Sequence, residues 1–139
     1  MAAVSPRAPR QPRARRRRGA VESLGSIVLG FESIVVFLGG LALFGLRVLP
    51  ESIPAWWAIV AGSVLAILMV ATAGMLRYRW AIAVGWVLQV VVALGGILEP
   101  ALVVVALIFG GMWGYATIKG AALDRRNAAL TDPGPSNGD

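Results

Sequence analysis

The sequence predicts an all-α membrane protein: an antiparallel bundle of four transmembrane helices with a basic N-terminal tail and a polar C-terminal tail. Three observations predict this fold class. Hydrophobic residues make up 58% of the 139 residues, and charged residues only 14%, against roughly 25% in soluble domains. The apolar residues form four segments of bilayer-crossing length. Their connections are short, so consecutive helices are expected to be antiparallel neighbours.

The N-terminal tail, residues 1–20, is rich in arginine, proline and alanine and has no acidic residue. Charge repulsion and the prolines predict that it is disordered. Its basic side chains are expected to fix the topology and to attract anionic lipid headgroups. Nucleic-acid binding is not expected, because no aromatic residue is interleaved with the charges. The basic cluster nearest the first helix consists of Arg15, Arg16, Arg17 and Arg18.

The four apolar segments predict helices over about 24–48, 55–76, 80–98 and 101–118. The first segment, at about 37 Å of helix, is long enough to cross a bilayer with some tilt. Pro50 and Pro54 separate it from the second segment. Pro100 suits the first position of the fourth helix. The transmembrane domain is therefore expected at 21–123, followed by a disordered cytoplasmic tail at 124–139.

The distribution of charge predicts the orientation. Arg47 is the only one of the 13 basic residues expected on the side opposite the tails. By the positive-inside rule, both termini lie in the cytoplasm. The aromatic residues agree, since Trp56 and Trp57 fall at the outer interface and Tyr78 and Trp80 at the inner one.

Composition also excludes several kinds of site. The chain has no cysteine and no histidine, which rules out disulfides, thiolate or imidazole metal ligands and any dyad of a nucleophile with histidine. No glycine-rich phosphate loop follows a strand, and no pair of carboxylates flanks a cleft. We therefore expect no enzymatic activity, no metal and no cofactor.

Glu32 is the most informative residue because it lies within the first apolar segment. A carboxylate at mid-helix costs roughly 3 kcal/mol on insertion scales, so it is expected to face protein rather than lipid. Gln89, in the third segment, lies at nearly the same depth, about 12–14 Å from the cytoplasmic end. We expect the two side chains to meet. Loss of water then favours a neutral carboxyl, which donates to the amide oxygen of Gln89.

Two interpretations of this pair remain open. It is either a structural clasp between helices or a site for coupled proton or cation binding, as intramembrane carboxylates often are. The aromatic residues Trp86, Phe109 and Trp113 are candidates for a cavity wall near Glu32, although such residues more often serve packing.

Small residues recur at helix-packing intervals. They let helix backbones approach closely within a bilayer. The fourth-helix row offers an alternative, since it could form the seam of a homodimer. The packing candidates are Gly39 on the first helix, Ala58 and Gly62 on the second, Gly85 on the third, and Gly110 and Gly114 on the fourth.

Three motifs carry a resemblance to a known family: the glutamate of Phe31-Glu-Ser, the Gly85-Trp-x-x-Gln89 motif, and Phe109-x-x-x-Trp113. Over roughly 21–123 the chain resembles a family of small actinobacterial membrane proteins, catalogued as domain of unknown function 4233. The resemblance implies four helices in a bacterial inner membrane. Members of that family are often encoded beside a folylpolyglutamate synthase, but the resemblance implies no activity for the motif residues.

The expected function is that of a non-enzymatic accessory or interaction protein, with Glu32 and Gln89 as an internal lock. Its expected partners are membrane lipids and either another membrane protein or a second copy of the chain. The alternative is a small proton-coupled transporter in which Glu32 is the exchange site. A sealed, hydrogen-bonded Glu32 favours the first function, and a water-reachable cavity lined by Trp86 and Trp113 favours the second.

Overall fold

The computed structural model describes residues 18–131, and within this range it contains four helices and no strand. They are α1 (Ala20–Leu46), α2 (Trp57–Gly74), α3 (Arg79–Gly95) and α4 (Ala101–Thr131). The all-α, four-helix prediction is therefore confirmed. Expectations about residues 1–17 and 132–139, including Arg15, Arg16 and Arg17, lie outside the described residues.

Three of the helices, α1, α2 and α4, are long and apolar enough to cross a membrane. This marks the chain as a membrane protein. The remaining helix, α3, is apolar but has only 17 residues, or about 25 Å of helix. It ends at Gly95, three residues before the expected boundary. The amides that follow donate to carbonyls three residues back, as in a 3₁₀ turn, instead of four residues back. One such bond joins the Leu98 amide to the Gly95 carbonyl.

The end of α1 forms a Schellman motif. Arg47 has a φ of 50°, in the left-handed region, and its amide donates to the Phe44 carbonyl at 3.2 Å. The Val48 amide donates to the Leu43 carbonyl, also at 3.2 Å. The helix therefore stops two residues before the expected boundary, and the exposed Arg47 side chain occupies a backbone position that glycine usually takes.

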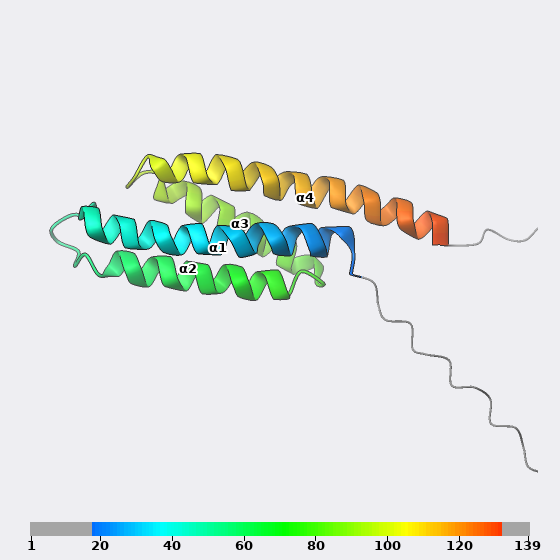
Figure 1. Cartoon of the computed structure of the whole chain (residues 1–139), viewed down its shortest axis with the longest axis horizontal. Helices are drawn as coiled ribbons and strands as arrows, with labels where there is room; N and C mark the ends of the chain where they lie inside the picture. The colour runs from blue at the N-terminus through cyan, green and yellow to red at the C-terminus, as the bar shows by residue number, and fades with distance from the viewer. Residues whose placement is uncertain (1–17, 132–139) are drawn as a thin grey trace, which may run out of the picture.

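Helix α1 makes the most extensive contacts in the bundle. It packs along α2 over most of its length and also against α4, while α3 packs against α4. Consecutive helices α2 and α3 make few contacts with each other. Figure 1 shows why: α3 begins beside the end of α2 and then slants away from it toward the start of α4. The short connection thus does not make α2 and α3 closely packed neighbours.

The core lies where α1, α3 and α4 converge and continues along the side of α1 that faces α2. Trp113, Leu29 and Met69 are its largest fully buried apolar side chains. Most remaining large apolar side chains are exposed, as expected for helices whose outer faces meet lipid tails instead of water.

The length of α4 differs from the sequence prediction. We expected the helix to end near 118 and residues 124–139 to be disordered, but α4 continues to Thr131. The residues after Ile118 are mostly good helix formers, including four alanines, and no proline occurs before Pro133. Figure 1 shows this end of α4 reaching beyond the other three helices.

The extension of α4 is attached to the start of α1. Gly19 supplies no side-chain cap to α1, and the Asp124 carboxylate takes its place. It accepts hydrogen bonds from the amides of Ala20 at 2.6 Å and Val21 at 3.2 Å. The approach requires Gly120, because a Cβ at that position would lie 2.9 Å from the Val21 backbone. A negative group at a helix N-terminus is also favoured by the helix dipole.

We expect Asp124→Ala to lower the free energy of unfolding by about 1 kcal/mol, the usual effect of losing an N-cap side chain. The amides of Ala20 and Val21 should then exchange hydrogen faster, as measured by hydrogen–deuterium exchange in detergent micelles. Asp124→Asn is the matched control, since its amide oxygen can still accept one bond. Unchanged exchange at both amides in the alanine variant would contradict the capping role.

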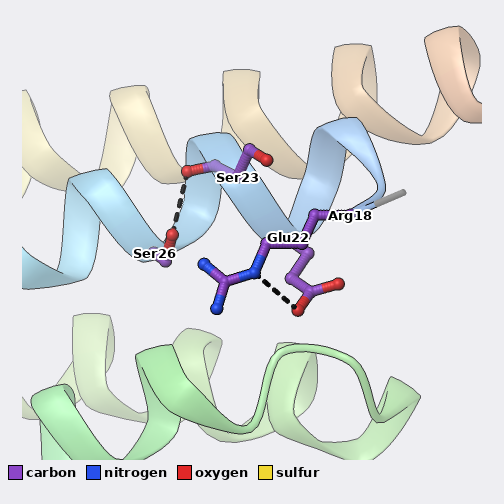
Figure 2. Close-up of polar contacts among 4 residues, drawn as sticks. All are labelled: Arg18, Glu22, Ser23 and Ser26. Carbon is purple, nitrogen blue, oxygen red and sulfur yellow. Dashed lines mark hydrogen bonds and ion pairs between the residues drawn. The ribbon is translucent and has the colours of Figure 1, made fainter. Parts of the chain in front are cut away.

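A surface ion pair joins Arg18, which precedes α1, to Glu22 in the first turn of that helix. Figure 2 shows the Arg18 guanidinium beside the Glu22 carboxylate, with 3.7 Å between Nε and Oε1, and the Ser26 hydroxyl donating to the Ser23 carbonyl. The Arg18 side chain is still 75% exposed. A surface pair four residues apart contributes only about 0.3–0.5 kcal/mol, so this pair adds little to stability.

Candidate functional site

The structure brings together the two polar residues that the sequence singled out. Glu32 of α1 has no exposed surface, and Gln89 of α3 is 5% exposed. The Gln89 side-chain amide donates from Nε2 to Oε2 of Glu32, with 2.5 Å between the two atoms. A carboxyl group and an amide therefore meet inside the bundle, shielded from the surrounding hydrocarbon.

The depth of the two residues explains why they meet. Glu32 lies 12 residues into α1 and Gln89 lies 10 residues into α3, which is about 18 Å and 15 Å along helices that run in the same direction. Nearby buried hydroxyl groups do not compete for this contact. Ser33, Thr72 and Thr117 each donate to a carbonyl of their own helix.

The direction of the hydrogen bond differs from the sequence prediction. We expected the carboxyl to donate to the amide oxygen of Gln89, but the amide NH₂ donates to the carboxyl oxygen. An amide donor suits a carboxyl group in either protonation state, because a carboxylate and a carboxylic acid both offer an acceptor oxygen. The observed contact therefore does not require a proton on Glu32.

Three buried polar atoms near this contact have no hydrogen-bond partner among the described residues. They are Oε1 of Glu32, Oε1 of Gln89 and Nε1 of Trp113. Unpaired buried polar groups are uncommon in folded proteins. The first two atoms are acceptors unless Glu32 is protonated, whereas the indole nitrogen is a donor. The bundle interior thus retains a capacity for hydrogen bonding that the Glu32–Gln89 contact does not use.

Trp113 of α4 fills the space between α1 and α3 on the side of this contact nearer the chain termini. It is fully buried. Its ring lies against Gly25 of α1 and Gly85 of α3: a Cβ at Gly25 would lie 3.2 Å from Cζ3, and a Cβ at Gly85 would overlap the ring. The indole therefore requires glycine at position 85 and leaves little room for a Cβ at position 25. Gly85, Gln89 and Trp113 together fix how α3 sits against the other helices.

The three aromatic residues predicted as a cavity wall lie in different environments. Two cavities of the described structure, of about 670 and 470 Å³, are lined by side chains other than Trp86, Phe109 and Trp113. Trp113 is core, and Phe109 is partly buried against the core. Trp86 is 45% exposed, and its ring lies near Gly114 of α4. Trp113 and Phe109 therefore pack within the bundle, whereas much of the Trp86 side chain faces outward.

The small residues of α4 face α3. A Cβ at Gly110 would lie 3.6 Å from Oε1 of Gln89, and one at Gly114 would lie 3.6 Å from the Trp86 ring. The row that we considered for a homodimer seam thus lies within the bundle. Gly111, by contrast, is exposed and has nothing within 4 Å of its Cβ position.

A close contact between α1 and α2 involves a residue that the sequence analysis did not select. Gly40 of α1 crosses Gly62 of α2, where a Cβ on Gly62 would lie 2.9 Å from the Gly40 Cα. Ala58 is buried in the same contact. At Gly39, by contrast, an added Cβ would lie 3.5 Å from Leu102, which is an ordinary van der Waals distance. The adjacent glycines Gly39 and Gly40 were visible in the sequence, but the choice between them depends on the rotation of α1.

Removing the carboxyl of Glu32 should have a modest effect on stability. Glu32→Leu leaves the Gln89 amide buried without an acceptor, and interhelical hydrogen bonds in membranes contribute about 0.6 kcal/mol on average and up to about 1.7 kcal/mol. We expect a loss within that range, measured by equilibrium unfolding in mixed micelles. Glu32→Gln keeps an acceptor oxygen and should lose less.

The double variant Glu32→Leu/Gln89→Leu provides the control. Because both polar groups are then absent, it should be no less stable than Glu32→Leu alone. Strict additivity of the two single changes would contradict an energetic link between the residues.

The chemical capacity of this site is narrow. Among residues 18–131, no group of three acidic side chains is placed to hold a metal ion. Glu32 can accept hydrogen bonds or take up a proton, and Gln89 can orient it. Their hydrogen bond links α1 to α3, whose backbones are not in extensive contact.

Comparison with known proteins gives one match. A family model described as "Protein of unknown function (DUF4233)" matches residues 23–129, which include nearly all of the four helices. No curated protein and no solved structure shows a significant match to the chain.

Proposed function

The chain belongs to this family of proteins of unknown function, and we propose that it is a non-enzymatic accessory protein of the membrane. In this proposal the bundle is an anchor, and the protruding end of α4 binds a partner. The observation that carries it is the sealed state of Glu32, which is fully buried and hydrogen-bonded to Gln89. A carboxyl group enclosed in this way serves better as a clasp than as an exchange site.

The end of α4 supports a role in partner binding. Leu123 and Leu130, seven residues apart, lie on the same side of the helix and are both exposed, Leu130 at 80%. Arg125 and Arg126 are exposed beside them. The bonds from the start of α1 to Asp124 hold the base of this segment. A fixed helix with exposed leucines and arginines suits recognition by an amphipathic or acidic protein surface.

We propose that the protein lies in the bacterial cell membrane with both termini in the cytoplasm, as the charge distribution indicates. The absence of native cysteine allows a direct test. In intact cells, a membrane-impermeant thiol reagent should label Ser52→Cys, in the α1–α2 connection, and should not label Ala128→Cys in α4. Labelling of Ala128→Cys alone would reverse the orientation.

Partner binding is tested by photo-crosslinking of the full chain in native membranes. A photo-reactive residue at Leu130 should yield a discrete heavier adduct. The same residue at Leu107, an exposed position within the apolar part of α4, is the control and should give lipid adducts only. The Leu130 adduct should persist in Glu32→Gln. Absence of a protein adduct at Leu130, or an identical adduct at Leu107, would overturn the proposed binding segment.

Proton-coupled transport remains the second candidate. One observation favours it: Oε1 of Glu32 is buried and has no hydrogen-bond partner within residues 18–131, so it is available for a proton. The purified protein in vesicles containing a pH-sensitive dye would then move protons when a substrate gradient is applied. Glu32→Gln would abolish that flux while leaving the Leu130 adduct intact, which separates the two functions.

A further inference from the structure

A large apolar groove lies at the end of the bundle opposite the chain termini. It has a volume of about 670 Å³ and is lined by all four helices and the α1–α2 connection. No charged residue lines it, and its only polar side-chain atom is the indole nitrogen of Trp57. Glycines at 39, 40, 62 and 95 contribute to its volume, because they place no side chain in it.

The arrangement of the helices explains this groove. Since α3 slants away from α2 toward α4, the two helices separate most at this end (Figure 1). Leu68 and Val91, on the two sides of the gap, both line the groove and are exposed. The groove therefore opens sideways between α2 and α3, toward the region that the bilayer occupies.

The depth of the groove indicates whether a lipid chain or a helix of another protein would fit in it. Along α1 it reaches from Leu43 down to Val36, and the α1–α2 connection extends it to Leu49. From Val36 to the end of α1 is about 15 Å of helix, which is about half of the roughly 30 Å hydrocarbon core. The buried Leu29, Met69 and Leu88 fill the interior beyond that depth. A crossing helix of a partner would need the full thickness, whereas a lipid chain needs one leaflet.

Three charged residues are close in sequence to residues that line this end of the groove. Leu49 and Ile53 line it, and Arg47 and Glu51 each lie two residues from Leu49 in the chain. Glu99 follows Leu98, another lining residue. Arg47 and Glu51 are exposed and form no ion pair within the described residues. One positive and two negative side chains complement a headgroup that carries both a phosphate and an ammonium group, and they oppose a purely anionic one.

We propose that this groove holds an acyl chain of one zwitterionic glycerophospholipid, with the phosphate beside Arg47 and the ammonium group beside Glu51 or Glu99. The lipid completes the bundle between α2 and α3, where the protein supplies few contacts of its own. This site is separate from the proposed lipid contact of the N-terminal arginines and from the partner-binding end of α4.

Native mass spectrometry tests the proposal on the full chain taken from nanodiscs that contain equal amounts of phosphatidylethanolamine and phosphatidylglycerol. The wild-type protein should retain one phosphatidylethanolamine molecule. Ala61→Phe, which fills the groove, should lose it. The matched control is Ala42→Phe, an exposed alanine of α1 that does not line the groove, and it should retain the lipid.

A second variant tests the headgroup independently of groove filling. Arg47→Asn removes the charge and still tolerates the left-handed backbone. It should weaken retention of phosphatidylethanolamine while circular dichroism stays unchanged. Equal retention in the Ala61→Phe and Ala42→Phe variants would overturn the site. So would preferential retention of phosphatidylglycerol by the wild type, or a second copy of the chain crosslinked through position 61.

Discussion

Replacing Trp113 with alanine is expected to lower the free energy of unfolding by about 3–5 kcal/mol, the usual range when a buried aromatic residue is removed. The indole fills the space between α1 and α3, and two glycines face it directly. Alanine would leave a cavity that the helices cannot close without moving α3. Equilibrium unfolding in mixed micelles, followed by circular dichroism, measures the loss.

A matched set of variants separates packing from hydrogen bonding at this position. Trp113→Phe keeps most of the ring volume but has no indole nitrogen. It should lose far less stability than Trp113→Ala, because the nitrogen has no partner among the described residues. Gly85→Ala should also destabilise the protein, by about 1–3 kcal/mol, because the added methyl overlaps the ring. The loss of stability caused by Gly85→Ala should be smaller in the Trp113→Phe background than in the wild type. A Trp113→Ala variant as stable as the wild type would contradict this account of the core.

Gly62→Val is expected to have the second large effect, about 3 kcal/mol or more, because it separates α1 from α2. The Cβ of the valine would lie 2.9 Å from the Gly40 Cα and 3.3 Å from the Val36 carbonyl oxygen. These are backbone atoms, so no side-chain rotation can relieve the overlap. The same unfolding measurement should show the loss, accompanied by faster hydrogen exchange in α2.

Gly30→Val is the matched control for this prediction. Gly30 is also a helical glycine, but nothing lies within 4 Å of its Cβ position. The glycine-to-valine change should therefore alter stability by less than about 1 kcal/mol there, the scale of intrinsic helix propensity. If Gly30→Val and Gly62→Val had equal effects, the crossing of Gly40 and Gly62 would not be what holds the helix pair together.

Much of the fold could be predicted because it depends on position along the chain. The length and polarity of each apolar segment determine how many helices form and where they turn. The meeting of Glu32 with Gln89 followed from depth, which for parallel helices is a count of residues multiplied by a constant rise. The predicted end of α4 was wrong. The end of an apolar segment marks where a bilayer crossing stops, whereas the helix itself can continue through polar residues.

The sequence by itself determined the helical class, the four segments and the level at which the two polar side chains lie. Only the tertiary structure decided that Gly40 rather than Gly39 meets α2, that Trp113 is core, that Asp124 caps α1 and that α3 leaves α2 to open a groove. The physical reason is that these features depend on how each helix is rotated and tilted. Helices that are apolar on every side show no contrast between the face toward lipid and the face toward protein, so shape complementarity sets rotation and tilt.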